Sequence, residues 1–187
     1  MNTETTRTQI MQHAQRLVQE RGYNGFSYRD LATLIGIKTS SIHYYFPQKE
    51  DLLLAIVQQY HARWLAAIQA IDTGLSADVK LRAYVDMHRQ AFCNTERICL
   101  AAALAADLAS LPADIRKMLQ GFYGANEDWL AQVLEQGVRE GSLDMPGDVR
   151  IAARSMFAAL QGSLATARLF NDSERMNDLL QAALSRQ

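Results

Sequence analysis

The sequence predicts an all-α protein with a small three-helix head at its amino end and a larger helical body. Three observations support this fold class. Apolar residues recur at helical spacing along most of the chain. Only three prolines interrupt it, and no long glycine or serine tract is present. Of the 187 residues, 49% are hydrophobic, which suffices to bury a sizeable core. We expect the head over residues 1–47 and the body over residues 48–187.

The first helix is expected from Thr5 to Arg21, because Ile10, Ala14 and Leu17 fall on one face. Gly22 follows directly and is placed to end the helix. This helix should brace the two that follow. Residues 1–50 carry an excess of two positive charges, whereas the whole chain has a formal net charge of −1. This small asymmetry fits a DNA-binding head on an acidic body.

Two short helices with a tight turn between them are predicted after the first helix. Ser27 and Asp30 have the spacing of a capping box, in which each side chain bonds the other residue's backbone amide. Gly36 supplies the sharp turn. A second helix is expected over Lys38–Phe46, and Pro47 ends it. Its outward positions carry hydroxyls, a histidine and tyrosines, which suit contacts to phosphates and base edges.

The residues expected to contact DNA lie on or beside this second helix and carry a polar group. They are Ser27, Thr39, Ser40, Ser41, His43, Tyr44, Tyr45 and Lys49. Hydroxyls bind either phosphates or bases and are therefore weakly specific. The helix has no arginine placed for guanine, so the operator sequence is not predicted. The alternative is that these side chains are ordinary surface polar groups.

The same stretch resembles the DNA-binding helix-turn-helix of the TetR/AcrR family of bacterial repressors. The matching positions are Phe26, Ser27, Leu31, Ala32, Gly36, Ile37, Ile42, Tyr44, Phe46, Lys49, Glu50 and Leu52. The resemblance implies an all-helical, dimeric, ligand-responsive repressor of double-stranded operator DNA. Lys38 stands where the family commonly has a capping serine, so we expect the cap to shift to Thr39. His43 stands where the family commonly has a tyrosine.

The body is predicted to contain a series of amphipathic helices, the first of which leaves the head without a flexible linker. We expect a break at residues 94–96 between the second and third of these helices. The predicted ranges are 48–71, 76–93, 98–108, 112–136 and 149–170, followed by a last helix after Asn171 and Asp172.

The last two predicted helices, over about residues 148–185, are the expected homodimer interface. The first of them is rich in small residues, including Ala158, Ala159 and Gly162, which let another helix approach closely. A four-helix arrangement across a two-fold axis would follow, and the family resemblance implies the same. The alternative is that the apolar faces of these helices close the core of the monomer.

Aromatic and polar residues of the body could line a cavity for a small-molecule inducer. The candidates are Trp64, His88, Phe92, Phe122 and Trp129. An aromatic stripe at helical spacing is more often part of a core, and this alternative stays open.

The two cysteines, Cys93 and Cys99, offer a second kind of trigger. Cys99 lies early in its predicted helix and close to Arg97, two features that lower a thiol pKa. The segment from Arg97 through the alanine-rich helix also resembles the electrophile-sensing branch of the family. That resemblance implies that Cys99 is the sensor. The alternative is a small buried hydrophobic residue.

Other classes of protein have little support in the sequence. It contains no phosphate-binding glycine loop and no recognisable catalytic grouping, so we expect neither an enzyme nor a cofactor. The histidines and cysteines lack close metal-ligand spacing. No apolar run approaches the length of a membrane span and no signal segment is recognised, so we expect a cytoplasmic protein. A helical adaptor that has lost DNA binding is the remaining alternative.

Overall fold

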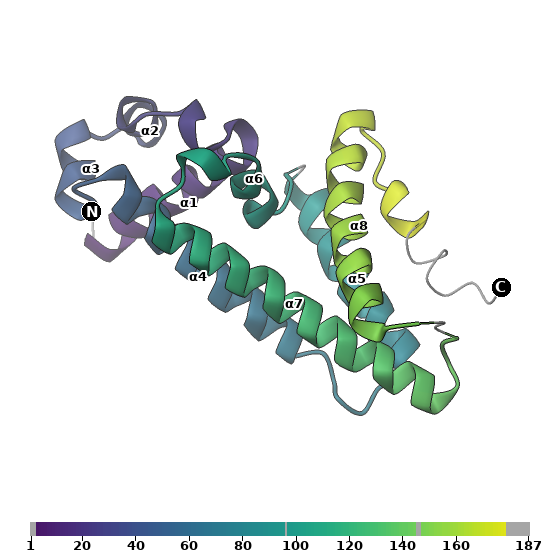
Figure 1. Ribbon diagram of the computed structural model, residues 1–187. Coiled ribbons are helices and arrows are strands. Elements are labelled where there is room, and N and C mark those ends of the chain that lie inside the picture. Colours follow the sequence, from purple (N-terminus) through teal and green to yellow (C-terminus); the bar gives the residue numbers. More distant parts are fainter. Residues whose placement is uncertain (1–2, 96, 145–146, 179–187) are drawn as a thin grey trace. The chain divides into compact units, whose positions relative to one another are not determined.

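The computed structural model describes residues 3–95, 97–144 and 147–178, and these residues form helices joined by turns (Figure 1). The elements are α1 (Thr3–Arg21), η1 (Tyr23–Gly25), α2 (Tyr28–Ile35), α3 (Thr39–Tyr45), α4 (Lys49–Gln69), α5 (Ala77–Thr95), α6 (Leu100–Ala106), η2 (Leu108–Ser110), α7 (Ala113–Glu140) and α8 (Val149–Phe170). Residues 175–178 are also helical. The described ranges contain no strand, and the predicted all-α class is confirmed. None of their helices combines the length and hydropathy needed to cross a bilayer.

The chain folds into two compact units. The head unit comprises the described residues up to Arg63 together with Cys99–Gln120, and the body unit comprises Trp64–Ile98 and the described residues from Gly121 onward. Helices α4 and α7 are continuous, and each contributes one part to each unit. The expected boundary at residue 47 concerns the DNA-binding segment and stays a prediction.

The head unit packs α1 against α2 and α6, and α2 against α3. Ile10, Leu31 and Ile42 are fully buried at its centre. The predicted capping box is present: the Ser27 amide donates to Asp30 Oδ2 (2.8 Å), and the Asp30 amide donates to Ser27 Oγ (3.3 Å). These bonds lower the pKa of the Asp30 carboxyl, with the Ser27 hydroxyl as the largest cause.

Tyr28 fixes the geometry of the two short helices relative to each other. Its buried hydroxyl lies 2.9 Å from the carbonyl of Phe46 and 2.7 Å from that of Gln48, just beyond the end of α3. The turn between the helices uses Gly36 in the left-handed region, at φ 75°. A residue without a Cβ adopts this backbone at little cost. The sequence therefore holds α3 in one orientation through local contacts.

Two expectations about helix ends are wrong. Lys38, rather than Thr39, is the N-cap residue of α3, and no side chain caps this helix. A serine at that position would have offered a hydroxyl, whereas lysine has only a donor. Helix α5 also continues through Asn94 and Thr95, where we expected a break. Weak helix propensity costs only a fraction of a kcal/mol per residue, which surrounding structure readily overrides. Glu96 lies outside the described residues.

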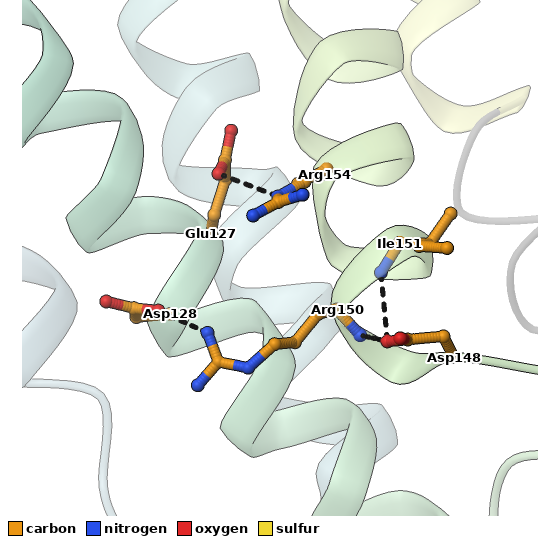
Figure 2. Close-up of polar contacts among 6 residues, drawn as sticks. All are labelled: Glu127, Asp128, Asp148, Arg150, Ile151 and Arg154. Atoms are coloured by element: carbon orange, nitrogen blue, oxygen red, sulfur yellow. Dashed lines mark hydrogen bonds and ion pairs between the residues drawn. The ribbon is translucent and has the colours of Figure 1, made fainter.

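The start of α8 is tied to α7 by charged side chains (Figure 2). The carboxylate of Asp148 accepts hydrogen bonds of 2.7 and 3.4 Å from two amides in the first turn of α8. Arg150 Nη1 lies 3.2 Å from Asp128 Oδ1, and Arg154 Nε lies 3.6 Å from Glu127 Oε2. Exposed ion pairs of this kind contribute only about 0–1 kcal/mol each. We infer that these ion pairs mainly determine which face of α8 turns toward α7. They contribute little to the stability of the fold.

Candidate nucleic-acid interface and effector site

Helix α3 presents a polar and aromatic surface. Ser40, His43 and Tyr44 are exposed, whereas Thr39, Ser41 and Tyr45 are half-buried. Ile42 faces the core, as expected from the sequence. The Tyr44 side chain is 78% exposed and meets the Tyr45 ring edge-on, with 5.1 Å between the ring centroids. A large aromatic ring held outward in this way is available to a binding partner.

The imidazole of His43 is oriented by two neighbours. Its Nδ1 lies 3.2 Å from the carbonyl of Pro47, and its ring meets the Tyr28 ring edge-on at 4.8 Å. A carbonyl oxygen can only accept, so Nδ1 carries the proton and Nε2 of the neutral ring is an acceptor. In a major groove such an acceptor matches the exocyclic amine of cytosine or adenine.

Two of the residues expected at DNA are engaged inside the head unit. The Ser27 hydroxyl donates to Asp30 Oδ2 at 2.6 Å. The ammonium of Lys49 donates to the carbonyls of Tyr23 (2.5 Å) and Phe26 (2.6 Å) and lies over both of their rings. Burial lowers the pKa of Lys49. A phosphate contact from either residue stays a prediction.

The carboxylate of Asp107, just after α6, holds the end of α1. Its Oδ2 accepts a hydrogen bond of 2.6 Å from the Tyr23 amide. Gly22 has φ 79°, and a Cβ at that position would lie 2.7 Å from the same oxygen. Burial and nearby Glu50 raise the pKa of Tyr23 to about 12. Sequence analysis missed Asp107, since nothing in its local pattern distinguishes it from a surface carboxylate.

Cys99 lies immediately before α6 and is buried, with 8% of its surface exposed. The hydroxyl of Tyr60 donates to its Sγ at 3.3 Å. Burial, followed by the thiol itself, raises the pKa of Tyr60 well above its usual value. The other candidate, Cys93, belongs to α5, but its side chain lies outside the described part of the structure.

The body unit contains a buried polar cluster centred on Asn126. Its Oδ1 accepts from Trp64 Nε1 (3.0 Å) and from the Tyr84 hydroxyl (2.6 Å), while its Nδ2 donates to the carbonyl of Phe122 (2.7 Å). Asn126 was not among the residues predicted from the sequence. The sequence does contain a sign of it, because Asn126 is a polar residue on the apolar face between Phe122 and Leu130 of α7. In the structure this asparagine is fully buried.

His88 belongs to the same cluster and is 2% exposed. Its ring centroid lies 4.4 Å from that of Trp64 and 4.7 Å from that of Tyr84. Its Nδ1 lies 3.0 Å from the carbonyl of Tyr84. Burial lowers the pKa of His88 to about 4, so the ring is neutral near pH 7. Its Nε2 has no hydrogen-bond partner among the described residues.

Gln161 on α8 is a second buried group whose hydrogen bonds are unmet. It is 9% exposed, and neither Oε1 nor Nε2 has a partner in the described ranges. A buried polar group left unsatisfied costs about 1–3 kcal/mol. Most buried polar atoms in proteins find a partner, and an exception needs an explanation.

Three of the predicted effector residues, Trp64, His88 and Phe122, come together in the body unit. Trp129 joins them through Tyr84, on which it stacks with 4.9 Å between centroids. Phe92 is buried on α5. The described residues contain no group of histidine, cysteine and carboxylate side chains that could hold a metal ion.

The outward face of α8 carries small side chains between two exposed apolar ones. The residues on this face are Ile151, Ser155, Ala158, Ala159, Gly162, Ala165, Thr166 and Leu169. A Cβ built at Gly162 would meet no atom within 4 Å. The expected last helix begins within residues 175–178, and the remainder of that helix lies outside the described residues.

Family comparisons cover most of the chain. The family described as "Bacterial regulatory proteins, tetR family" matches residues 10–56. The family described as "Tetracyclin repressor-like, C-terminal domain" matches residues 77–183. The first match contains α2, α3 and their turn, and the second contains the polar cluster from Tyr84 onward and α8.

Individual proteins are similar over nearly their whole length. A TetR-family transcriptional regulator from Agrobacterium tumefaciens has a TM-score of 0.91 at 29% identity, covering 98% of this chain and 100% of that one. A TetR transcriptional regulator from Legionella pneumophila has a TM-score of 0.83 at 32% identity, covering 94% and 93%. The HTH-type transcriptional repressor NemR of Escherichia coli strain K12 is 25% identical over 189 residues, covering 96% of this chain and 94% of NemR.

Proposed function

Since the chain belongs to the TetR family of bacterial regulatory proteins, we propose that it is a homodimeric repressor released from operator DNA by a small molecule. Its family and relatives are DNA-binding transcriptional regulators rather than enzymes, and the adaptor alternative is not favoured. The exposed polar surface of α3 on a rigid helix-turn-helix carries the proposal. Because a repressor acts where the chromosome lies, we place its action in the cytoplasm.

In the proposed complex α3 enters the major groove of each half-site. Ser40, His43 and Tyr44 supply contacts to base edges or phosphates, since they are exposed. Thr39, Ser41, Tyr45, Ser27 and Lys49 are proposed to contact phosphates, although the Lys49 ammonium would first have to leave two carbonyl partners. We therefore expect Lys49 to contribute less than Tyr44.

The proposed dimer interface uses α8 and the last helix, over about residues 148–185. The outward face of α8 supports this, because its small side chains permit close approach of a second helix. Ile151 and Leu169 at the two ends of the face are 61% and 78% exposed and would be buried by a two-fold partner. Two linked heads then bind two half-sites together.

The proposed effector site is the polar cluster of the body unit, with Trp64, His88, Phe92, Phe122 and Trp129 around it. The unmet hydrogen bonds of His88 and Gln161 support it, since a ligand would satisfy them. An effector acts only through a difference in affinity between two conformations. Within the head unit, the signal is proposed to pass from the end of α6 to η1 through Asp107, whose carboxylate accepts from the Tyr23 amide.

A thiol trigger at Cys99 is the second candidate. The hydrogen bond from the Tyr60 hydroxyl to Sγ supports it, because it ties the sulfur to a contact between α4 and the residue before α6. A covalent adduct would break this bond and displace the residue that precedes α6. Cys93 is a further candidate thiol.

The first experiment measures binding of the full-length chain to DNA from upstream of its own gene. Tyr44→Ala should weaken binding about 10- to 100-fold, the cost of one good contact at each site. Val138→Ala, which shortens an exposed side chain on α7, is the matched control. Equal affinity of Tyr44→Ala and the control would show that α3 is not the contact surface.

A second experiment separates the two triggers. Wild type and Cys99→Ser are compared for operator release by N-ethylmaleimide. Release of the wild type alone would assign the trigger to Cys99. Equal release of both proteins would move attention to Cys93 or other groups. No release, with operator binding intact, would favour the non-covalent site in the body unit.

A further inference from the structure

The buried polar cluster of the body unit determines which nitrogen of His88 carries the proton. The Tyr84 carbonyl, 3.0 Å from Nδ1, can only accept a hydrogen bond. Nδ1 is therefore the donor in the neutral ring, and Nε2 is left with a lone pair. Nε2 is buried and has no partner among the described residues, so it is a hydrogen-bond acceptor whose position is unfilled.

The donors nearest to His88 are directed elsewhere. Trp64 and Tyr84 both pack on the His88 ring, yet the indole N–H and the phenol O–H both point to Asn126 Oδ1. The Asn126 amide nitrogen in turn donates to the carbonyl of Phe122. Filling the unmet position therefore requires a donor from outside this cluster.

The cluster also lacks a charge that could neutralise an ionic ligand. Its interacting side chains are two aromatic rings, an amide and a neutral imidazole. Lys80, a buried cation of the body unit, is already engaged: its ammonium is bound to the carbonyl of Thr73 (2.8 Å) and to Gln136 Oε1 (2.6 Å). A carboxylate or ammonium beside His88 would be buried without a partner, which is strongly unfavourable.

Gln161 supplies a second polar position on an adjacent helix. Helices α5 and α8 pack against each other within the body unit (Figure 1). His88 lies about three helical turns after the start of α5, and Gln161 lies about three turns after the start of α8. The Gln161 amide can both donate and accept, so it suits either kind of group on a ligand.

We propose that the effector is a neutral, largely apolar molecule that donates an O–H or N–H hydrogen bond to Nε2 of His88 and bonds the Gln161 amide. This inference rests on the proposed function and adds the chemical class of the effector. Aromatic rings of Trp64 and Phe122 beside the acceptor suit a ring-sized apolar body. An anionic effector would find no charged partner among the side chains that interact in this cluster, so we expect it to bind more weakly.

Three matched probes test the class: phenol, anisole and benzoate. Phenol has the donor, anisole replaces the donor hydrogen with a methyl group, and benzoate is anionic. Isothermal titration of the full-length chain should give phenol an affinity at least tenfold higher than that of anisole, the difference expected for about one hydrogen bond. Benzoate should bind more weakly than phenol. Equal or absent binding of phenol and anisole, or tighter binding of benzoate, would overturn the proposal.

Variants assign the preference to the two side chains. His88→Leu should abolish the difference between phenol and anisole, and Gln161→Leu should weaken phenol about tenfold. Ser163→Ala, at a nearby position on α8 whose hydroxyl bonds the Ala159 carbonyl of its own helix, should bind phenol as the wild type does. An unchanged preference in His88→Leu would overturn the role of His88, and unchanged phenol affinity in Gln161→Leu would overturn the role of Gln161.

Nitrogen-15 NMR of the wild type provides a readout that does not depend on a variant folding. The His88 spectrum should show a protonated Nδ1 and an unprotonated Nε2, and phenol should shift the Nε2 resonance. A protonated Nε2 would overturn the proposal. Operator binding is measured on the same samples: its absence with a retained phenol preference would refute the repressor function, whereas the reverse result would refute only the effector class.

Discussion

The polar groups around the helix-turn-helix and two buried side chains of the body unit differ in how their hydrogen bonds are met. In the head, the Tyr28 hydroxyl meets two carbonyls, the Lys49 ammonium meets two more, and Asp107 accepts from the Tyr23 amide. In the body, Nε2 of His88 and the whole amide of Gln161 lack partners in the described residues. The polar groups around the helix-turn-helix thus fix a geometry, whereas His88 and Gln161 of the body keep unmet positions beside the satisfied Asn126.

This difference matches the two tasks of a ligand-responsive repressor. A DNA-binding head must hold α3 in one orientation, because the contacts to each half-site depend on that orientation. An effector-binding body must form interactions with its ligand that are more favourable in one conformation than in the other. Otherwise the ligand could not shift a conformational equilibrium. Unmet hydrogen bonds, each worth about 1–3 kcal/mol, are of the size that such a shift requires.

The sharpest test of the contrast replaces one tyrosine in each unit. Tyr28→Phe removes the single O–H that the Phe46 and Gln48 carbonyls share and should lower the free energy of unfolding by about 2–3 kcal/mol. Tyr84→Phe should cost only about 1 kcal/mol, because Trp64 still donates to Asn126 Oδ1. Urea unfolding followed by circular dichroism gives both values. A larger cost for Tyr84→Phe would invert the comparison.

The next effect is a pH dependence that belongs to His88. Its pKa is about 4 in the folded chain and about 6.5 when unfolded, so the unfolded state binds more protons between these values. The contribution of neutral His88 to the free energy of unfolding is fully present above pH 6.5. It falls as the pH drops, with about 2 kcal/mol lost between pH 7.5 and pH 5. Burial lowers the pKa of His61 in the same direction, so the test is the difference from His88→Leu.

That variant should lose about 2 kcal/mol less than the wild type over the same interval, as measured by urea midpoints at the two pH values. Identical pH profiles for the two proteins would show that His88 is not held neutral by burial.

Gln161→Leu should raise the free energy of unfolding, whereas most core substitutions lower it. It removes an amide with unmet hydrogen bonds and keeps a side chain of similar size, so the unliganded protein should gain about 1–2 kcal/mol. Thermal unfolding at a fixed protein concentration measures the gain, with Ser163→Ala as the near-neutral control. A loss of stability would mean that the Gln161 amide has partners in solution.

The smallest expected effect is at the contact between Asp107, just after α6, and η1, within the head unit. Asp107→Ala removes the acceptor of the Tyr23 amide and should cost about 1 kcal/mol in stability. Its larger consequence is functional: operator binding should persist, while release by the effector should require a higher effector concentration. Unchanged release would show that Asp107 does not carry the signal.

Local patterns predicted the reading head well. The capping box of Ser27 and Asp30, the left-handed Gly36 and the burial of Ile42 all depend on neighbours close in sequence. Helix α8 has the predicted bounds, because small and apolar residues repeat at helical spacing over its length and Asn171 adopts a left-handed cap. Such features require only propensity, periodicity and turn chemistry.

Long-range contacts could not be predicted in the same way. The Asp107 carboxylate meets the Tyr23 amide 84 residues away, and Lys49 meets carbonyls before α2 rather than solvent. Asn126 and Gln161 were visible as polar residues inside apolar faces of α7 and α8. Their hydrogen-bonding state depends on which helices pack around them, and a single helix does not determine this.

The central claim is that the head binds operator DNA in a sequence-specific way, and operator titration tests this claim most directly. The full-length wild type is titrated against DNA from upstream of its own gene and against scrambled DNA of the same composition, at several salt concentrations. The account predicts tighter binding to the upstream DNA and a linear fall of log affinity with log salt, from displaced phosphate counterions. Equal affinity for the two DNAs, or none for either, would contradict it.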